Sequence, residues 1–404
     1  MTVFPSGETW KRTMTEMTLQ GTRRAPEGGS HIKLADYFGL RAAGVIYAWI
    51  LLIVFLAVVS SYLGRPPYLS ELNVSNLLEQ AAFAGILALA MGVLLISGSF
   101  DLSVGSLTAL CALAAAYFTN EFGVAAAIPL TLAVGLIAGT FNGVLCLYLN
   151  LSAFIVTLGT LSMFRGLALL LSEGRTILIQ DPEQARLLKA LATTDIYPPN
   201  LILLAGLAVL LFGYWFFYRH GRNMLAFGAA MAAGIALVAF SFGYSYTPKL
   251  KASVVVWFGL ALLFWGFMSA TVYGKRIYAV GGNERAAQVA GVMVKFYKTL
   301  PFTLVGLAAG IAGTLFAGRL GAVDPNSFTG FELIVIAAAV VGGISILGGQ
   351  GHVLKSMVGA LLLFTINNGF NMLNINAHFQ LVFAGIVVIA AAALYVATDK
   401  RRIR

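Results

Sequence analysis

Apolar stretches of about 20 residues recur from near one end of this sequence to the other, and they constrain its fold more than any other feature. A helix of that length crosses the hydrocarbon core of a bilayer, whereas a surface helix of a soluble protein carries a polar face. The segments are 43–63, 77–97, 103–119, 124–148, 153–172, 200–218, 224–243, 253–273, 300–318, 332–347, 354–371 and 379–398. The sequence therefore predicts an all-α, polytopic membrane protein with about twelve transmembrane helices.

Composition supports this fold class and excludes others. Hydrophobic residues make up 59% of the chain and charged residues 10%, whereas soluble domains carry about 25% charged residues. A soluble enzyme, a disordered protein and a secreted disulfide scaffold are excluded. The two cysteines, Cys111 and Cys146, lie inside apolar segments, where free buried thiols are expected.

The basic residues predict the orientation of the chain in the membrane. The net charge is +10; in a soluble protein this would suggest a nucleic-acid partner, but in a membrane protein basic loops mark the cytoplasmic side. If all twelve segments cross and the N-terminus is inside, cytoplasmic loops hold 18 Lys and Arg and external loops hold 7, with Arg165 inside a segment. Both termini are predicted to be cytoplasmic. The expected partner of the chain is the lipid bilayer and not nucleic acid.

The apolar segments and the basic loops together predict the domain organisation. Residues 1–42 form a basic cytoplasmic tail that we expect to be partly disordered, and they lack the apolar core of a cleaved signal peptide. Residues 43–398 form the transmembrane domain, 274–299 a basic cytoplasmic loop within it, and 399–404 a second cytoplasmic tail.

A polar break at 97–105 interrupts an otherwise apolar stretch. Asp101 stands where the next helix should begin, so it is expected to cap that helix by accepting hydrogen bonds from free N–H groups. A second interpretation is that Asp101 and Ser103 line a water-filled path, because carboxylates inside a membrane are often functional. The two interpretations are compatible.

Other polar residues within apolar segments are candidates for the same path. Asn142, Asn367 and Asn368 either bridge helices by hydrogen bonds or line a path for a hydroxylated solute. Arg165 is expected to reach the outer interface or to pair with a carboxylate such as Glu173.

Glycine spacing predicts close helix packing. Gly135, Gly139 and Gly143 fall on one face of a helix, and Gly306 and Gly310 repeat the spacing. Small residues let helix backbones approach in lipid. The glycine-rich segment 342–351 is expected to form a flexible or tightly packed turn near the cytoplasmic face.

The 274–299 loop carries the signals of a short helix with caps at both ends. Asn283 is a good N-cap, Glu284–Ala290 would form two turns, and Gly291 would follow as the C′ glycine. Such a helix is shaped to dock into a partner, although a solvated connector would show similar sequence signals.

Motifs of enzymes are absent from the sequence. It contains no G-x-x-x-x-G-K-[ST] loop for ATP and no H-E-x-x-H pair, and its four histidines lie in the tail or at segment ends. Nothing in the sequence therefore favours an enzyme active site, and we expect no catalytic residues, metal or cofactor.

Several motifs together resemble one family. They are VSNLLEQAAFAGILALAMGVLLISGSFDLSVGS (74–106), FIVTLGTLSMFRG (154–166), YAVGGNERAAQVAGV (278–292), VVGGISILGGQG (340–351) and NNG (367–369). From about residue 73 to its end, the chain resembles the permease subunits of binding-protein-dependent sugar ABC importers of the ribose/xylose/galactose type, and most of all the xylose-type permeases.

This resemblance implies a homodimeric permease of the bacterial cytoplasmic (inner) membrane, with a path at the dimer axis for a monosaccharide such as xylose. A separate ABC ATPase subunit would dock on the cytoplasmic side, and an extracytoplasmic binding protein would deliver the sugar. The family core has ten crossings, so 200–243 would be an extra helix pair.

The resemblance also assigns site residues. Coupling to the ATPase would involve Gly282, Asn283, Glu284, Ala287 and Gly291. Candidates for docking the binding protein are Arg65, Arg175, Arg186 and Arg319.

Two departures from the family pattern leave the sugar open: Ile334 stands where the family usually has Asp, and Ile344 where it usually has Thr. Alternative functions are an ABC permease for a branched-chain amino acid or a nucleoside, and a secondary transporter.

Overall fold

The computed structural model of the chain describes residues 40–196 and 249–376, together with a few isolated positions between 203 and 239 and between 379 and 386. Residues 1–44 and 45–404 form two separate units, and the description below concerns the second. Most of the predicted pair 200–243, most of the last segment 379–398 and both tails lie outside the described residues.

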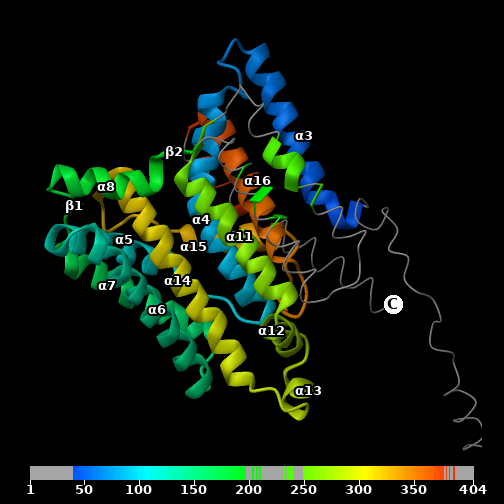
Figure 1. Cartoon of the computed structure of the whole chain (residues 1–404). Coiled ribbons are helices and arrows are strands. Elements are labelled where there is room, and N and C mark those ends of the chain that lie inside the picture. The colour runs from blue at the N-terminus through cyan, green and yellow to red at the C-terminus, as the bar shows by residue number, and fades with distance from the viewer. Residues whose placement is uncertain are drawn as a thin grey trace, which may run out of the picture. The chain divides into compact units, whose positions relative to one another are not determined.

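Helices make up nearly all of the described chain (Figure 1). They are α3 (Leu40–Tyr62), α4 (Glu71–Ile96), α5 (Val104–Phe122), α6 (Val124–Tyr148), α7 (Ala153–Ser172), α8 (Pro182–Thr193), α11 (Ala252–Ala270), α12 (Val272–Gly282), α13 (Glu284–Val289), α14 (Val294–Leu320), α15 (Phe331–Val341) and α16 (Val353–Met372). Two antiparallel pairs of short strands join β1 (Ile177–Leu178) to β4 (Ala322–Val323) and β2 (Asp195–Ile196) to β3 (Leu250–Lys251).

Within the described residues, seven helices are long and apolar enough to cross a membrane: α3, α4, α6, α7, α11, α14 and α16. The predicted segment 332–347 is shorter than expected, because α15 has only 11 residues and ends at Val341. At about 1.5 Å per residue such a helix covers roughly half of a bilayer core, so it does not cross alone. The predicted segment 253–273 is also divided, since α11 ends at Ala270 and α12 begins at Val272.

Segments predicted on the same side of the membrane lie at the same end of the helical bundle. Helix α8 and the strand pairs are at one end and α13 is at the other (Figure 1). At the first end, the Asn120 amide donates to the Leu178 carbonyl. At the second, the Lys295 ammonium lies 5.1 Å from the centre of the Tyr148 ring. The contacts agree with the predicted alternation of crossings, and the assignment of one end to the cytoplasm remains a prediction.

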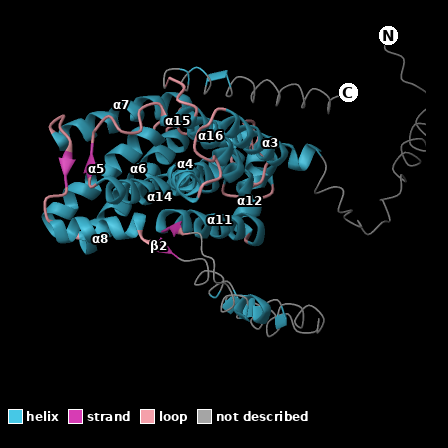
Figure 2. Ribbon diagram, turned by 90° about the horizontal axis from the view of Figure 1, so that it is seen from above, coloured by secondary structure: helices cyan, strands magenta, loops and turns pink. Residues whose placement is uncertain are grey.

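Helix α4 forms the centre of the fold. Other helices surround it when the molecule is seen from above (Figure 2), and 94% of its most apolar window is buried. Gly85 lets α11 approach, since an added Cβ there would overlap the ring of Trp257, which is fully buried. Helix α4 therefore meets protein, and not lipid, on nearly every side.

The predicted glycine packing is confirmed between α6 and α14. An added Cβ at Gly139 would lie 2.8 Å from the Cα of Gly306, and one at Gly143 would lie 2.9 Å from Thr299 Cγ2. The two backbones are in direct contact, as small-residue spacing in lipid predicts.

Candidate functional site

A buried polar cluster occupies the turn between α4 and α5. Asp101 Oδ1 accepts from the Ser103 N–H at 2.7 Å and from Ser103 Oγ at 2.6 Å. The Asn142 amide on α6 donates to Asp101 Oδ2 at 3.1 Å and to Ser103 Oγ at 2.8 Å. Three of the predicted path residues are thus brought together, and each of them is fully buried.

The prediction that Asp101 itself caps the helix is wrong in its position. Helix α5 begins at Val104 with Ser103 as its N-cap residue. Asp101 lies two residues earlier, and its carboxylate binds the backbone and hydroxyl of that N-cap residue. The carboxylate therefore fixes the turn before the helix and ties it to α6, an arrangement that a simple cap does not provide.

Protein donors engage both oxygens of Asp101, whereas Asn142 Oδ1 has no hydrogen-bond partner within the described structure. A buried carboxylate is tolerated only when donors compensate its lost hydration. The cluster is closed to solvent in this conformation. That its residues line a path for the solute remains a prediction.

Asn368 bridges two helices. Its amide donates to Asn73 Oδ1 at 2.8 Å and accepts from Asn73 Nδ2 at 3.1 Å. Asn73 also donates to the Tyr68 carbonyl, so α16 is joined to the first turn of α4 and to the loop before it. Of the two interpretations left open above, helix bridging fits Asn368. Its neighbour Asn367 is half-buried.

Sequence analysis does not single out Asn73, although a signal is present. An amide within the first turn of an otherwise apolar stretch needs a partner once it is buried. The identity of the partner, Asn368, follows only from the fold, because the two residues are 295 positions apart.

Arg165 binds a loop and not the carboxylate expected. Its guanidinium donates to the carbonyls of Pro325 and Ser327, which precede α15. The predicted pairing with Glu173 is not observed: Glu173 instead ends α7 in a left-handed conformation. Arg165 therefore fastens α7 to the start of α15.

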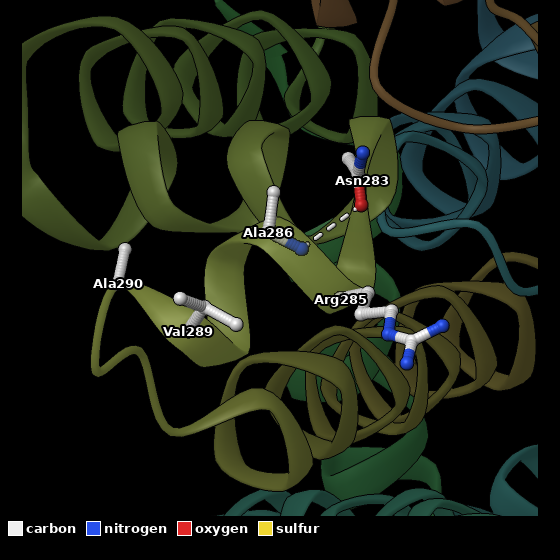
Figure 3. Close-up of a pocket in the computed structure, with 5 residues that line it drawn as sticks. All are labelled: Asn283, Arg285, Ala286, Val289 and Ala290. Atoms are coloured by element: carbon white, nitrogen blue, oxygen red, sulfur yellow. Dashed lines mark hydrogen bonds between the residues drawn. The ribbon is translucent and has the colours of Figure 1, made fainter. Parts of the chain in front are cut away.

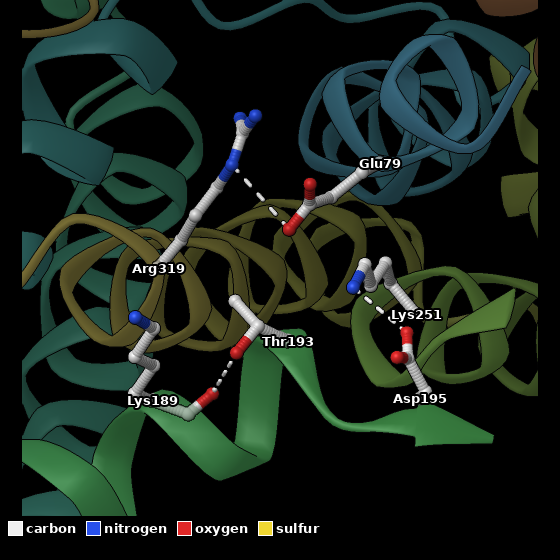
Figure 4. Close-up of polar contacts among 6 residues, drawn as sticks. All are labelled: Glu79, Lys189, Thr193, Asp195, Lys251 and Arg319. Carbon is white, nitrogen blue, oxygen red and sulfur yellow. Dashed lines mark hydrogen bonds and ion pairs between the residues drawn. The ribbon is translucent and has the colours of Figure 1, made fainter. Parts of the chain in front are cut away.

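Arg319 is also engaged within the protein (Figure 4). Its Nε lies 3.4 Å from Glu79 Oε1, and its guanidinium lies 5.6 Å from the centre of the Phe83 ring. The Glu79 side chain is only 7% exposed and that of Arg319 25%, so this pair links α4 to the end of α14 and leaves little of Arg319 for a partner.

The other arginines proposed for docking, Arg65, Arg175 and Arg186, are exposed. Nearby, Lys251 Nζ binds Asp195 Oδ1 at 2.7 Å and holds β2 against β3 (Figure 4). The role of the arginines toward a binding protein remains a prediction.

The predicted short helix in the 274–299 loop is present as α13. Asn283 Oδ1 accepts from the Ala286 N–H at 2.9 Å, which confirms the N-cap (Figure 3). The helix ends one residue earlier than expected, at Val289, and Gly291 follows with φ of 79°. The N–H groups of Gly291 and Val292 donate to the carbonyls of Gln288 and Ala287, which is a Schellman ending.

One face of α13 packs and the other is open. Ala287 is buried, and Glu284 forms an ion pair with Lys298 on α14. On the open side, Asn283, Arg285, Ala286, Val289 and Ala290 line a shallow hollow (Figure 3). Val289 is 86% exposed, so the helix presents an apolar side chain beside a cation.

Helix α12 leads into this element and is tied down near its end. The Tyr278 hydroxyl donates to the Gly351 carbonyl at 2.8 Å. Burial raises the pKa of Tyr278, so the hydroxyl keeps its proton and remains a donor. Among the residues that the structure describes, no group of three or more His, Cys, Asp or Glu side chains could hold a metal ion.

Comparison with known proteins places these features in a family. Residues 73–235 and 221–392 match the family described as "Branched-chain amino acid transport system / permease component". The chain is 31% identical to the ribose import permease protein RbsC of Bacillus subtilis (strain 168), over 84% of this chain and 89% of that protein. It is 31% identical to the xylose transport system permease protein XylH of Escherichia coli (strain K12), over 92% of this chain and 98% of that protein.

A xylose transport system permease protein from Haemophilus influenzae is 33% identical over 83% of this chain and 91% of that protein. No solved structure matches the chain. The resemblance noted in the sequence is thus confirmed, and the chain belongs to the branched-chain amino acid transport system / permease component family, as a multi-pass protein of the bacterial inner membrane.

Proposed function

We propose that this chain is the membrane subunit of an ABC importer for a pentose, xylose or ribose, and that two copies enclose the path. A separate ATPase subunit supplies the energy, and an extracytoplasmic binding protein delivers the sugar. The observation that carries the proposal is α13, a helix with caps at both ends and an exposed apolar side chain, in a sequence that has no ATP-binding loop of its own.

The caps of α13 support a docking role. A helix of six residues is far too short to be stable by itself. Here Asn283 satisfies a free N–H group at one end and Gly291 ends the other in a left-handed turn. The ion pair between Glu284 and Lys298 holds the helix against α14. The helix is therefore preformed, which lowers the entropy lost when a partner binds Val289 and Arg285.

The solute is inferred from the relatives and from the chemistry of the buried groups. A zwitterionic amino acid needs counter-charges along its path, whereas a sugar needs hydrogen-bonding groups. Protein atoms already engage the charges of Asp101 and Arg165. The curated relatives named above are ribose and xylose permeases. The family description favours a branched-chain amino acid as the competing solute.

Reconstitution in vesicles tests the proposal. The chain is combined with an ABC ATPase subunit and an extracytoplasmic sugar-binding protein from the same organism, and labelled xylose, ribose and leucine are offered. We expect ATP-dependent uptake of one pentose that requires both partners. Uptake by the chain alone under a pH or sodium gradient would show a secondary transporter, and leucine uptake would establish the competing solute.

A pair of variants tests the docking helix. Gly291→Val places a β-branched residue at φ of 79°, which unwinds the end of α13. The matched control is Gly321→Val, because Gly321 also follows a helix, at φ of 67°, with open space around it. We expect only Gly291→Val to lose ATPase co-purification. If both variants retain the ATPase at the wild-type level, α13 is excluded as the docking element.

A further inference from the structure

Three segments of the chain meet through their backbones where α4 ends. The first is Ile96 with Gly98, the second is the last turn of α12 at Gly281, and the third is the loop before α16 at Gly348 and Gly349. We name the four glycines, Gly98, Gly281, Gly348 and Gly349, the glycine joint. No side chain separates the segments there.

Three of the four glycines, Gly281, Gly348 and Gly349, leave no room for a Cβ atom. The Gly349 N–H donates to the Ile96 carbonyl at 2.8 Å. A Cβ added at Gly281 would overlap that carbonyl oxygen and lie 2.9 Å from the Gly349 nitrogen. A Cβ at Gly348 would lie 2.8 Å from Gly98 Cα and 2.7 Å from the Gly281 oxygen. Backbone atoms therefore set the spacing of the three segments.

Crowding distinguishes Gly281 from its neighbour. A Cβ added at Gly282 would meet only the Cα of Gly349, at 3.8 Å, which is an ordinary contact. The two residues are adjacent in α12, but only Gly281 requires the absence of a side chain. A glycine is required at position 281 because of its contact with the end of α4, and not because of the geometry of α12.

The joint lies between the two sites described above. On one side, the chain passes from Gly281 through Asn283 into α13 within a few residues. On the other side, Ile96 is the last residue of α4, five residues before Asp101. The hydrogen bond from Tyr278 to Gly351 adds a second tie between α12 and the loop.

We propose that the glycine joint transmits displacement of α13 to the Asp101 turn, with Gly281 as the residue that makes the contact stiff. The inference rests on the proposed function and adds the route by which the ATPase acts. Backbones in contact cannot be compressed, and the hydrogen bond to Ile96 resists their separation. A long side chain in the same place would absorb a small shift by changing rotamer.

Gly281→Ala tests the proposal in the full complex with ATPase and binding protein. The control is Gly266→Ala on α11, where an added Cβ meets nothing within 4 Å. ATPase co-purification, ATP hydrolysis and sugar uptake are measured for both. We expect Gly281→Ala to keep the ATPase but to lower the sugar imported per ATP hydrolysed about tenfold, and Gly266→Ala to match wild type.

The opposing results are distinct. Unchanged import per ATP in Gly281→Ala, or loss of its ATPase, would overturn transmission through the joint. If Gly281→Ala does not reach the membrane, Tyr278→Phe decides, because it removes one hydrogen bond and adds no atom. We expect it to lower import per ATP about twofold to threefold, and an unchanged ratio would overturn the proposal.

Failure of the proposed function is seen in the wild type. A wild-type chain that binds no ATPase and imports no sugar rejects both the function and the joint. A wild-type complex that imports sugar, beside a Gly281→Ala complex that does so equally well, rejects the joint alone.

Discussion

Replacing Asp101 by Asn is the most informative change in the buried cluster, because the two side chains have nearly the same shape. One oxygen is kept and still accepts from Ser103. The other becomes an amino group, which then faces the amino group of Asn142 at the position of the 3.1 Å hydrogen bond. Two donors then oppose each other. Turning the Asn142 amide would present its unpartnered Oδ1 to the new donor, but Ser103 Oγ would then lose the hydrogen bond that it accepts from Asn142.

The size of the effect follows from the bonds involved. Leaving a buried donor unpaired costs about 1–3 kcal/mol. The two bonds from Ser103 also weaken, since a neutral acceptor replaces a charged one, but burying an amide in place of a carboxylate offsets that loss. We expect Asp101→Asn to lower the free energy of unfolding by about 1–3 kcal/mol. A simple helix cap would predict almost no change, because Asn caps as well as Asp.

The free energy of unfolding can be measured by denaturant titration in detergent micelles. Asn142→Asp, added to Asp101→Asn, exchanges donor and acceptor and should recover at least half of the loss. Two results would refute the reasoning: a change below about 0.5 kcal/mol for Asp101→Asn, or a double variant whose effect is the sum of the two single effects.

Three further predictions concern helix packing, the amide bridge and the docking helix. Gly139→Leu forces α6 away from Gly306, so size-exclusion chromatography should show loss of folded protein; a normal profile would contradict the packing. Asn368→Ala removes both hydrogen bonds between Asn368 and Asn73, so that Asn73 keeps only its bond to the Tyr68 carbonyl; it should cost about 1–3 kcal/mol in thermal unfolding. Asn73→Ala should cost less in the Asn368→Ala background than alone, whereas additive losses would argue against the bridge. Asn283→Ala removes a cap worth about 1 kcal/mol and should weaken ATPase binding about fivefold in a titration, whereas unchanged affinity would separate capping from docking.

Local chemistry made α13 predictable from the sequence. The choice of Asn283 as cap and Gly291 as ending depends on residues within one or two helical turns, and the structure places both as expected. The close packing of α6 was equally predictable from its glycines, because small residues at helical spacing have few other uses in an apolar segment. The existence of most long helices followed from their length alone.

Burial was not predictable in the same way. Helices α3 and α4 are both strongly apolar, yet 11% of the most apolar stretch of the first and 94% of that of the second are buried inside the protein. Lipid and protein interior are equally apolar, so hydropathy does not distinguish them. Hydrogen-bond partners far apart in the sequence, such as Asp101 and Asn142, could not be predicted either, because a single sequence does not show which polar groups meet.

The central position of α4 has a consequence for how the protein is made. Its neighbours α11, α14, α15 and α16 all follow it in the chain. At about 5–20 residues per second, the end of α16 is synthesised roughly 15–55 s after the end of α4. During that interval the nascent helix resides in the bilayer without its final neighbours, and Glu79 has no Arg319 beside it. The apolar composition of α4 therefore stabilises it first in the ribosome-bound intermediate, where the helix contacts lipid. In the complete protein the same side chains contact other helices, which have displaced the lipid.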